Sequence, residues 1–218
     1  MFYRLIRRLF RIVAAPMFRF RVDGVHHVPR HGPAILIARH RSWLDPPCVG
    51  GACPRPVRFL IANRVYHTPW ARWFYRQMES IPVSPGGPGS LGALRKALRR
   101  LRNGEVIGIF PEGRVVRPGE PSDVQPGAAL LAVHTGAPVV PVCIEGSARA
   151  WPHGRKCPRA ARVRVFIGRP LSPPVGRGRE AVSTMAQRIQ AVLELDEGGE
   201  TTTDDASPKL GVMRKRTQ

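Results

Sequence analysis

The chain has 218 residues, of which 43% are hydrophobic, so it is long enough for one compact domain with a real core and a short tail. Lys and Arg total 35 against 15 Asp and Glu, and the resulting net charge of +20 favours anionic partners such as nucleic acid, acidic lipid or phosphorylated substrates. No run of about 18 apolar residues occurs, which argues against a membrane-spanning helix.

Residues 1–15 predict the clearest helix of the chain, with an apolar side and a basic side. No acidic residue precedes Asp23, and a purely basic polar face is typical of a helix that lies in a membrane interface. We therefore expect residues 1–20 to be an amphipathic, membrane-associating segment; an ordinary helix packed against the domain is the alternative. The basic side consists of Arg4, Arg7, Arg8 and Arg11, and the apolar side of Phe2, Leu5, Ile6, Leu9, Phe10, Ile12 and Val13.

Strand and helix patterns alternate from there to residue 195, which predicts an α/β fold with a mixed, largely parallel sheet flanked by helices. Residues 21–195 are expected to form the folded domain, and the polar residues 196–218 a disordered tail. Strands are expected at residues 34–38, 57–61, 80–83, 106–110, 139–144 and 163–167, and those at 34–38 and 106–110 are expected to be buried. A helix is expected to begin at Pro69, and others to span residues 90–101, 128–135 and 181–195. Leu91, Leu94, Leu98 and Leu101 form the apolar face predicted for residues 90–101.

The cysteines and the N-terminal sequence indicate a protein that is not exported. The spacing of Cys48, Cys53, Cys143 and Cys157 fits no common zinc site, so we expect four free thiols in a reducing compartment. The best apolar run near the N-terminus, residues 12–18, is short and interrupted by proline, unlike a signal peptide.

His40 and Asp45 follow the first predicted buried strand, at the kind of position where open α/β sheets bind ligands. Their spacing suits a turn into a helix, in which the carboxylate can hold one imidazole nitrogen and leave the other free as a base. From spacing alone, the alternative is that Asp45 caps a helix and His40 is a surface residue.

Glu112 follows the strand predicted at residues 106–110, and acidic residues are scarce in this part of the chain. A carboxylate at that place can orient substrate hydroxyls. Gly113 allows backbone to approach a ligand closely, and Arg114 or Arg117 can bind phosphate. The alternative is a turn in which Glu112 is merely solvated.

Four motifs in order resemble those of the 1-acylglycerol-3-phosphate acyltransferase family, the glycerolipid acyltransferases. The first motif, His, four residues and then Asp, is matched by His40 and Asp45, with its usual serine at Ser42. The others are matched by Ile81-Pro82-Val83, by Phe110-Pro111-Glu112-Gly113, and by Val140-Pro141-Val142 after Gly136-Ala137-Pro138. The resemblance runs from residue 22 to residue 168. Four ordered motifs are far more specific than any one of them.

The resemblance implies an enzyme in which His40, oriented by Asp45, deprotonates the hydroxyl of a lysophospholipid, most simply lysophosphatidate, to give phosphatidate. The hydroxyl oxygen would attack the thioester carbonyl of acyl-CoA or acyl-carrier protein, and no metal or other cofactor would be required. Residues expected to bind or position the acceptor are Ser42, Glu112, Gly113, Arg114 and Arg117.

The implied partners are the lysophospholipid, the acyl donor and anionic membrane lipids. The implied location is peripheral or monotopic, on the cytoplasmic face of the cell membrane. No nucleic acid is expected as a partner, because no RNP, zinc-finger or helix-turn-helix pattern accompanies the basic charge.

The chain departs from the family pattern in three of its motifs. Arg39 replaces the usual Asn before the first motif, and Pro85 stands where the second motif has an Arg implicated in binding the acceptor phosphate. The third motif continues with Arg114-Val115 in place of Thr-Arg. The same chemistry on a lyso-aminolipid or another lysophospholipid is therefore one alternative. A non-catalytic basic protein that binds acidic membrane or nucleic acid is another.

Overall fold

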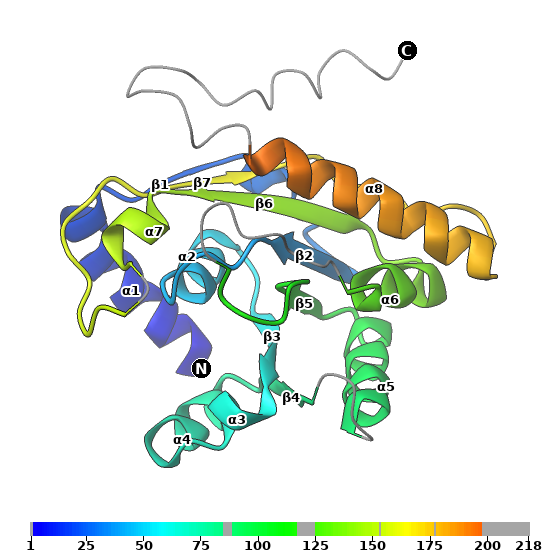
Figure 1. The fold of residues 1–218 in the computed structure, drawn as a ribbon, viewed down its shortest axis with the longest axis horizontal. Coiled ribbons are helices and arrows are strands. Elements are labelled where there is room, and N and C mark those ends of the chain that lie inside the picture. Colours follow the sequence, from blue (N-terminus) through cyan, green and yellow to red (C-terminus); the bar gives the residue numbers. More distant parts are fainter. Residues whose placement is uncertain (1, 85–88, 117–124, 153, 177, 198–218) are drawn as a thin grey trace.

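The computed structural model describes residues 2–84, 89–116, 125–152, 154–176 and 178–197. These residues contain a seven-stranded sheet in the order β1-β7-β6-β2-β5-β3-β4, which is parallel except for the β6–β7 pair (Figure 1). The predicted mixed, largely parallel α/β fold is confirmed. The strands are β1 (Arg21–Asp23), β2 (Ala34–Ala38), β3 (Val57–Ala62), β4 (Ile81–Val83), β5 (Val106–Ile109), β6 (Val139–Glu145) and β7 (Arg164–Ile167).

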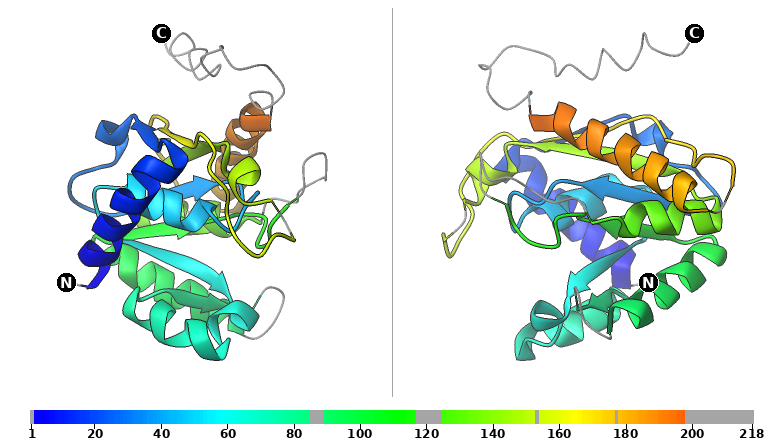
Figure 2. Two further views of the ribbon diagram at one scale, coloured as in Figure 1. Left: turned by 90° about the vertical axis from the view of Figure 1, so that its left-hand side faces the viewer. Right: turned by 45° about the vertical axis from the view of Figure 1, so that its right-hand side comes forward.

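The central strands are apolar along their whole length because helices cover both faces of the sheet. All five residues of β2 are buried, and Leu36 faces a core layer formed with α1 and α2, whereas Ile35 and Ile37 face a layer formed with α5, α6 and α8. Figures 1 and 2 show α5, α6 and α8 side by side. The helices are α1 (Phe2–Phe18), α2 (Asp45–Ala52), α3 (Asn63–Tyr66), α4 (Pro69–Gln77), α5 (Gly89–Arg102), α6 (Gly127–Thr135), α7 (Ser147–Ala150) and α8 (Arg179–Glu197), with a 3-10 turn η1 (Val25–His27).

The first helix packs against α2 and shares the core of the domain. Tyr3, Ala14 and Phe18 are buried, and the Tyr3 hydroxyl donates a hydrogen bond of 3.2 Å to the carbonyl of Gly50. The ring of Phe10 lies against Gly51, where an added Cβ would come within 2.5 Å of it. One face of α1 therefore belongs to the folded domain. The placement of the helix in a membrane interface stays a prediction. The boundary at residue 20 between a membrane-associating segment and the folded domain also stays a prediction.

The apolar face predicted for α5 is wrong at its first turn, where Leu91 is 63% exposed. The buried face is centred on Ala93, Ala97 and Leu101. Small side chains at the contact let α5 approach its neighbours closely, and this orientation turns Leu91 to solvent. The predicted strands and helices otherwise match the observed ones to within a few residues, and the prediction about the tail falls largely outside the described residues.

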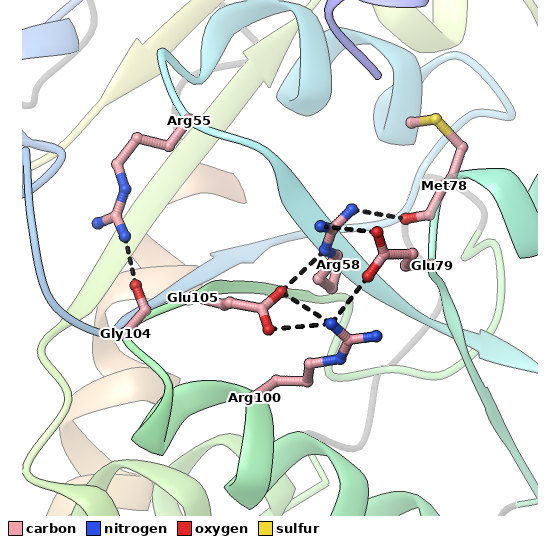
Figure 3. A network of polar contacts seen from close by, with 7 residues as sticks. All are labelled: Arg55, Arg58, Met78, Glu79, Arg100, Gly104 and Glu105. Atoms are coloured by element: carbon pink, nitrogen blue, oxygen red, sulfur yellow. Dashed lines mark hydrogen bonds and ion pairs between the residues drawn. The ribbon is translucent and has the colours of Figure 1, made fainter. Parts of the chain in front are cut away.

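Four charged side chains form a network at the amino end of β5 (Figure 3). Glu105, just before β5, accepts from Arg58 on β3 and from Arg100 on α5, at 3.0 Å each. Glu79, just before β4, pairs with the same two arginines at 3.2 and 2.8 Å. The network ties α4, α5, β3 and β5 together at the edge of the sheet opposite to the predicted site.

All four cysteines are free thiols, as expected, and Cys48 and Cys53 are buried. Among the described residues, no helix combines the length and the apolar character needed to cross a bilayer.

Candidate active site

The structure brings His40 and Asp45 together at the carboxyl end of β2. Asp45 opens α2 and is fully buried, and its Oδ2 accepts hydrogen bonds of 2.7 Å from the backbone amides of both Arg41 and Ser42. The same oxygen lies 3.3 Å from Nδ1 of His40. Two backbone amides thus fix the carboxylate, and the carboxylate in turn fixes the imidazole.

This arrangement determines which nitrogen of His40 can act as a base. Because Asp45 accepts at Nδ1, that nitrogen carries the proton and Nε2 keeps its lone pair. The side chain of His40 is 13% exposed, so it remains accessible at the end of the strand. The geometry is that of an oriented base and not of a surface histidine beside a helix cap.

Aromatic rings pack against one face of the His40 imidazole. The ring of Phe110 stacks on His40 at a centroid distance of 4.5 Å, and the ring of Phe59 stacks on Phe110 at 6.0 Å. Gly108 makes room for Phe59, since a Cβ there would lie 2.5 Å from that ring. The sequence identified Phe110 as a motif residue but not Phe59 as its support. The unusual glycine inside a buried strand was the available signal.

Glu112 lies beside this pair, after β5, and its side chain is only 2% exposed. Burial raises its pKa, although nearby backbone amides and the charges of Arg39 and His40 act to lower it. Nε of Arg39 lies 3.4 Å from Oε1 of Glu112. The alternative of a solvated turn therefore does not describe this carboxylate, because it points into the protein and is paired with a cation.

A protein-family model described as Acyltransferase matches residues 19–145, more than half of the chain. The chain belongs to the acyltransferase family. The match covers His40, Asp45, Glu112 and the rings that support them.

Relatives with curated names share this enzyme class. The acyltransferase is 22% identical to 1-acyl-sn-glycerol-3-phosphate acyltransferase of Bacillus subtilis over 78% of this chain and 82% of the relative. It is 25% identical to the enzyme of the same name from Pseudomonas aeruginosa, over 84% and 70%. A lyso-ornithine lipid O-acyltransferase of the same species is 31% identical over 62% of this chain and 51% of the relative.

A solved structure supports the fold. The crystal structure of the 1-acyl-sn-glycerophosphate acyltransferase of Thermotoga maritima matches with a TM-score of 0.75, at 23% identity, over 93% of this chain and 81% of that one. At this identity the match shows the fold, whereas the enzyme class, which the four motifs also indicated, rests on the family model and the curated relatives.

Ser42 lies behind the pair formed by His40 and Asp45. It is 1% exposed, its hydroxyl donates to the carbonyl of Trp151 at 2.9 Å, and it accepts from the amide of Leu44 at 3.1 Å. These bonds shape the turn between β2 and α2, which positions Asp45. Contact between Ser42 and substrate stays a prediction.

The turn after β5 presents Gly113 to open space. Its φ of 65° is in the left-handed region, its amide donates to the carbonyl of Phe110 at 3.0 Å, and an added Cβ would meet no atom within 4 Å. The next residues return to the site, where the amide of Val116 donates to the carbonyl of His40 at 2.7 Å. Arg114 is exposed on this loop. Arg117 lies outside the described residues, as does Pro85.

Within the described part of the chain, no three His, Cys, Asp or Glu side chains are grouped closely enough to hold a metal ion.

Proposed function

We propose that this acyltransferase moves a fatty acyl group from acyl-CoA or acyl-carrier protein to the free hydroxyl of 1-acyl-sn-glycerol-3-phosphate. The observation that carries the proposal is the buried Asp45, held by two amides and directed at Nδ1 of His40. The names of the Bacillus subtilis and Pseudomonas aeruginosa relatives supply the acceptor.

The reaction follows from this geometry. Nε2 of His40 takes the hydroxyl proton as the acceptor oxygen bonds to the thioester carbonyl carbon, and Asp45 stabilises the imidazolium that forms. The tetrahedral oxyanion then collapses, the carbon–sulfur bond breaks, and the leaving thiolate takes the proton from His40. Atoms and charge balance with the two substrates alone, so the proposal includes no cofactor.

A lyso-aminolipid is the second candidate acceptor. Of the three curated relatives named above, the lyso-ornithine lipid enzyme has the highest sequence identity to this chain, although the match covers a smaller share of the chain. Pro85 also replaces a family arginine implicated in phosphate binding, and proline offers neither a charge nor a side-chain donor. Among the described residues, exposed Arg114, next to Gly113, is the best candidate for binding a phosphate monoester; Arg117 and Arg39 are further candidates.

An acceptor panel tests the proposal. Purified protein is given labelled acyl-CoA or acyl-carrier protein with lysophosphatidate, lyso-ornithine lipid or lysophosphatidylcholine, and free thiol and labelled product are both measured. We expect the highest kcat/KM with lysophosphatidate. Faster turnover of lyso-ornithine lipid would move the assignment to that acceptor. Thiol release that is equal without any acceptor would contradict acyl transfer.

We further propose that α1 attaches the enzyme peripherally to an anionic membrane surface. Beside its docked face, the helix leaves Leu5, Leu9, Ile12 and Val13 between 49% and 70% exposed. Arg4, Arg8 and Arg11 are exposed along the adjacent edge. Apolar and basic stripes side by side suit insertion among anionic headgroups, which attract each basic side chain.

The α1 surface extends toward α4. The ring of Phe2 meets that of Trp73 edge to face at 5.4 Å, and Trp73 is 61% exposed. Arg72 and Arg76 are exposed on α4, the helix that carries Trp73. Tryptophan prefers the interfacial level of a bilayer, so its position beside α1 agrees with one shared contact surface.

Substitution of exposed residues tests this attachment better than deletion, because residues 1–15 include Tyr3 and Ala14 of the core. We expect Leu9→Ser with Ile12→Ser to reduce flotation with phosphatidylglycerol vesicles while the melting temperature stays unchanged. Leu91→Ser is the control, since it removes from α5 a leucine whose exposure, 63%, lies between those of Leu9 and Ile12. Equal losses in both proteins would contradict the assignment to α1.

A further inference from the structure

A buried ion pair connects the ends of two adjacent parallel strands beside the catalytic histidine. Arg39 follows β2 directly and Glu112 follows β5, and Nε of the first lies 3.4 Å from Oε1 of the second. Their side chains are 6% and 2% exposed. Charged residues are seldom buried to this extent unless they are paired, so the two positions depend on each other.

Arg39 also reaches the last helix of the domain. Its NH1 donates a hydrogen bond of 3.4 Å to the backbone carbonyl of Leu193 in α8. The guanidinium therefore lies between α8 and the turn that carries Glu112. A planar group with several donors can hold two partners at fixed angles, which a lysine ammonium does less well.

The carboxylate of Glu112 is under-satisfied, which distinguishes it from an ordinary structural acid. Neither oxygen makes a hydrogen bond of good geometry to a described residue, although backbone amides lie near them, and both oxygens are buried. Burial raises the pKa of Glu112, and the backbone amides of Glu112 and His40, together with the charges of Arg39 and His40, oppose that rise without cancelling it. Such a group persists against its desolvation cost where its charge serves another part of the protein.

We propose that Arg39 is a positioning residue that acts through Glu112: it locks the turn of Phe110 to Gly113 against the end of β2 and holds a carboxylate beside His40. The proposal rests on the acyl transfer proposed above and concerns how the site is held in order. Loss of Arg39 leaves an uncompensated buried carboxylate, which takes up a proton. The turn that stacks Phe110 on His40 then loses its electrostatic attachment.

A double-mutant cycle tests whether Arg39 acts through Glu112. We expect Arg39→Met to lower kcat for acyl transfer by about 100-fold in the wild-type background, since a small displacement of catalytic groups has effects of that size. In the Glu112→Gln background the same change should have little further effect. Arg39→Lys should restore part of the activity, because the charge returns without the planar fork.

Arg39 could instead matter only because it holds α8 in place through Leu193. The acid limb of the pH–rate profile separates that role from an action through Glu112. Arg39→Met should move that limb to higher pH, because Glu112 then protonates earlier. Arg55→Met is the control, since Arg55 is also partly buried and donates to the backbone carbonyls of Pro29 and Gly104 at the other end of the sheet. The control should lower stability without moving the limb.

A measurement that does not depend on turnover completes the test. The ¹³C-carboxyl signal of Glu112, assigned through Glu112→Gln, should titrate about one to three pH units higher after Arg39→Met. An unchanged titration, or an equal loss of activity in both backgrounds of the cycle, would overturn the proposal. An inactive wild-type enzyme with a displaced Glu112 titration would instead refute the proposed acyl transfer and leave the coupling established.

Discussion

The sheet has an amino edge, where its central parallel strands begin, and a carboxyl edge, where they end. Each carries a cluster of charged side chains, and the two clusters differ in how many hydrogen bonds their carboxylates accept. At the amino edge, Glu105 receives hydrogen bonds from both Arg100 and Arg58. Burial would raise the pKa of Glu105, but the two arginines outweigh it and lower the pKa below its ordinary value. This cluster stabilises the fold.

At the carboxyl edge, Glu112 and Asp45 are more deeply buried and less completely bonded. Both oxygens of Glu112 and Oδ1 of Asp45 lack hydrogen-bond partners among the described residues. Here burial raises the pKa of Glu112 in spite of the arginine beside it. Charges that the fold does not fully satisfy thus lie at the edge that carries the proposed active site, which is also where parallel sheets bind ligands.

The largest expected effect belongs to the base at the carboxyl edge. His40→Ala should lower kcat by about 1,000-fold, because the acceptor hydroxyl then lacks a group to take its proton. Asp45→Asn should also lower kcat strongly, since it no longer fixes the tautomer of His40. Thiol release is the measurement, with circular dichroism as the check on folding. Near-native turnover of folded His40→Ala would refute the mechanism.

Removal of both partners of the buried pair should separate activity from stability. The combined change Arg39→Met and Glu112→Gln leaves no unpaired buried charge, so we expect the free energy of unfolding to stay within about 1 kcal/mol of wild type. Acyl transfer should nevertheless fall strongly. Urea unfolding and thiol release measure the two quantities. A double variant that keeps full activity would return the carboxyl-edge pair to a purely structural role.

A smaller effect is expected at the acceptor. Arg114→Ala should weaken the apparent affinity for lysophosphatidate by about 1.5–3 kcal/mol, the range for a hydrogen bond to a charged group, with little change in the KM of the thioester. Lyso-ornithine lipid, which has no phosphate monoester, is the comparison substrate. If KM rises equally for both acceptors, Arg114 supports the loop and does not recognise phosphate.

The smallest effect is expected at the amino edge. Glu105→Gln should lower the free energy of unfolding by about 1 kcal/mol at pH 7 without altering turnover, since the group is partly exposed and screened. The pKa of Glu105 is lowered in the folded protein, so its stabilisation is complete above the ordinary glutamate pKa and disappears as the pH falls through the folded value. Urea unfolding at pH 7 and pH 3 should show the difference between variant and wild type shrinking in acid. A constant difference would mean that Glu105 contributes by packing alone.

The sequence by itself determined the fold class and the proximity of His40 and Asp45, because both depend on local patterns. Continuous apolar runs such as residues 34–38 and 106–109 require burial on both faces, which makes a parallel sheet covered by helices. His40 and Asp45 follow one strand within a single turn, so their spacing already placed them within reach of each other. The four ordered motifs then identified the enzyme class.

Tertiary structure alone decided which of several equivalent faces became buried. The seven apolar residues of α1 looked like one stripe, but docking on Gly50 and Gly51 divides them into a packed face and an exposed face. Leu91 likewise turned outward because the alanines of α5 permit closer packing. The pairing of Arg39 with Glu112 was equally hidden, since 73 positions separate them and only the β2–β5 register brings them together. Side-chain burial depends on contacts between distant segments, and sequence periodicity carries no record of those contacts.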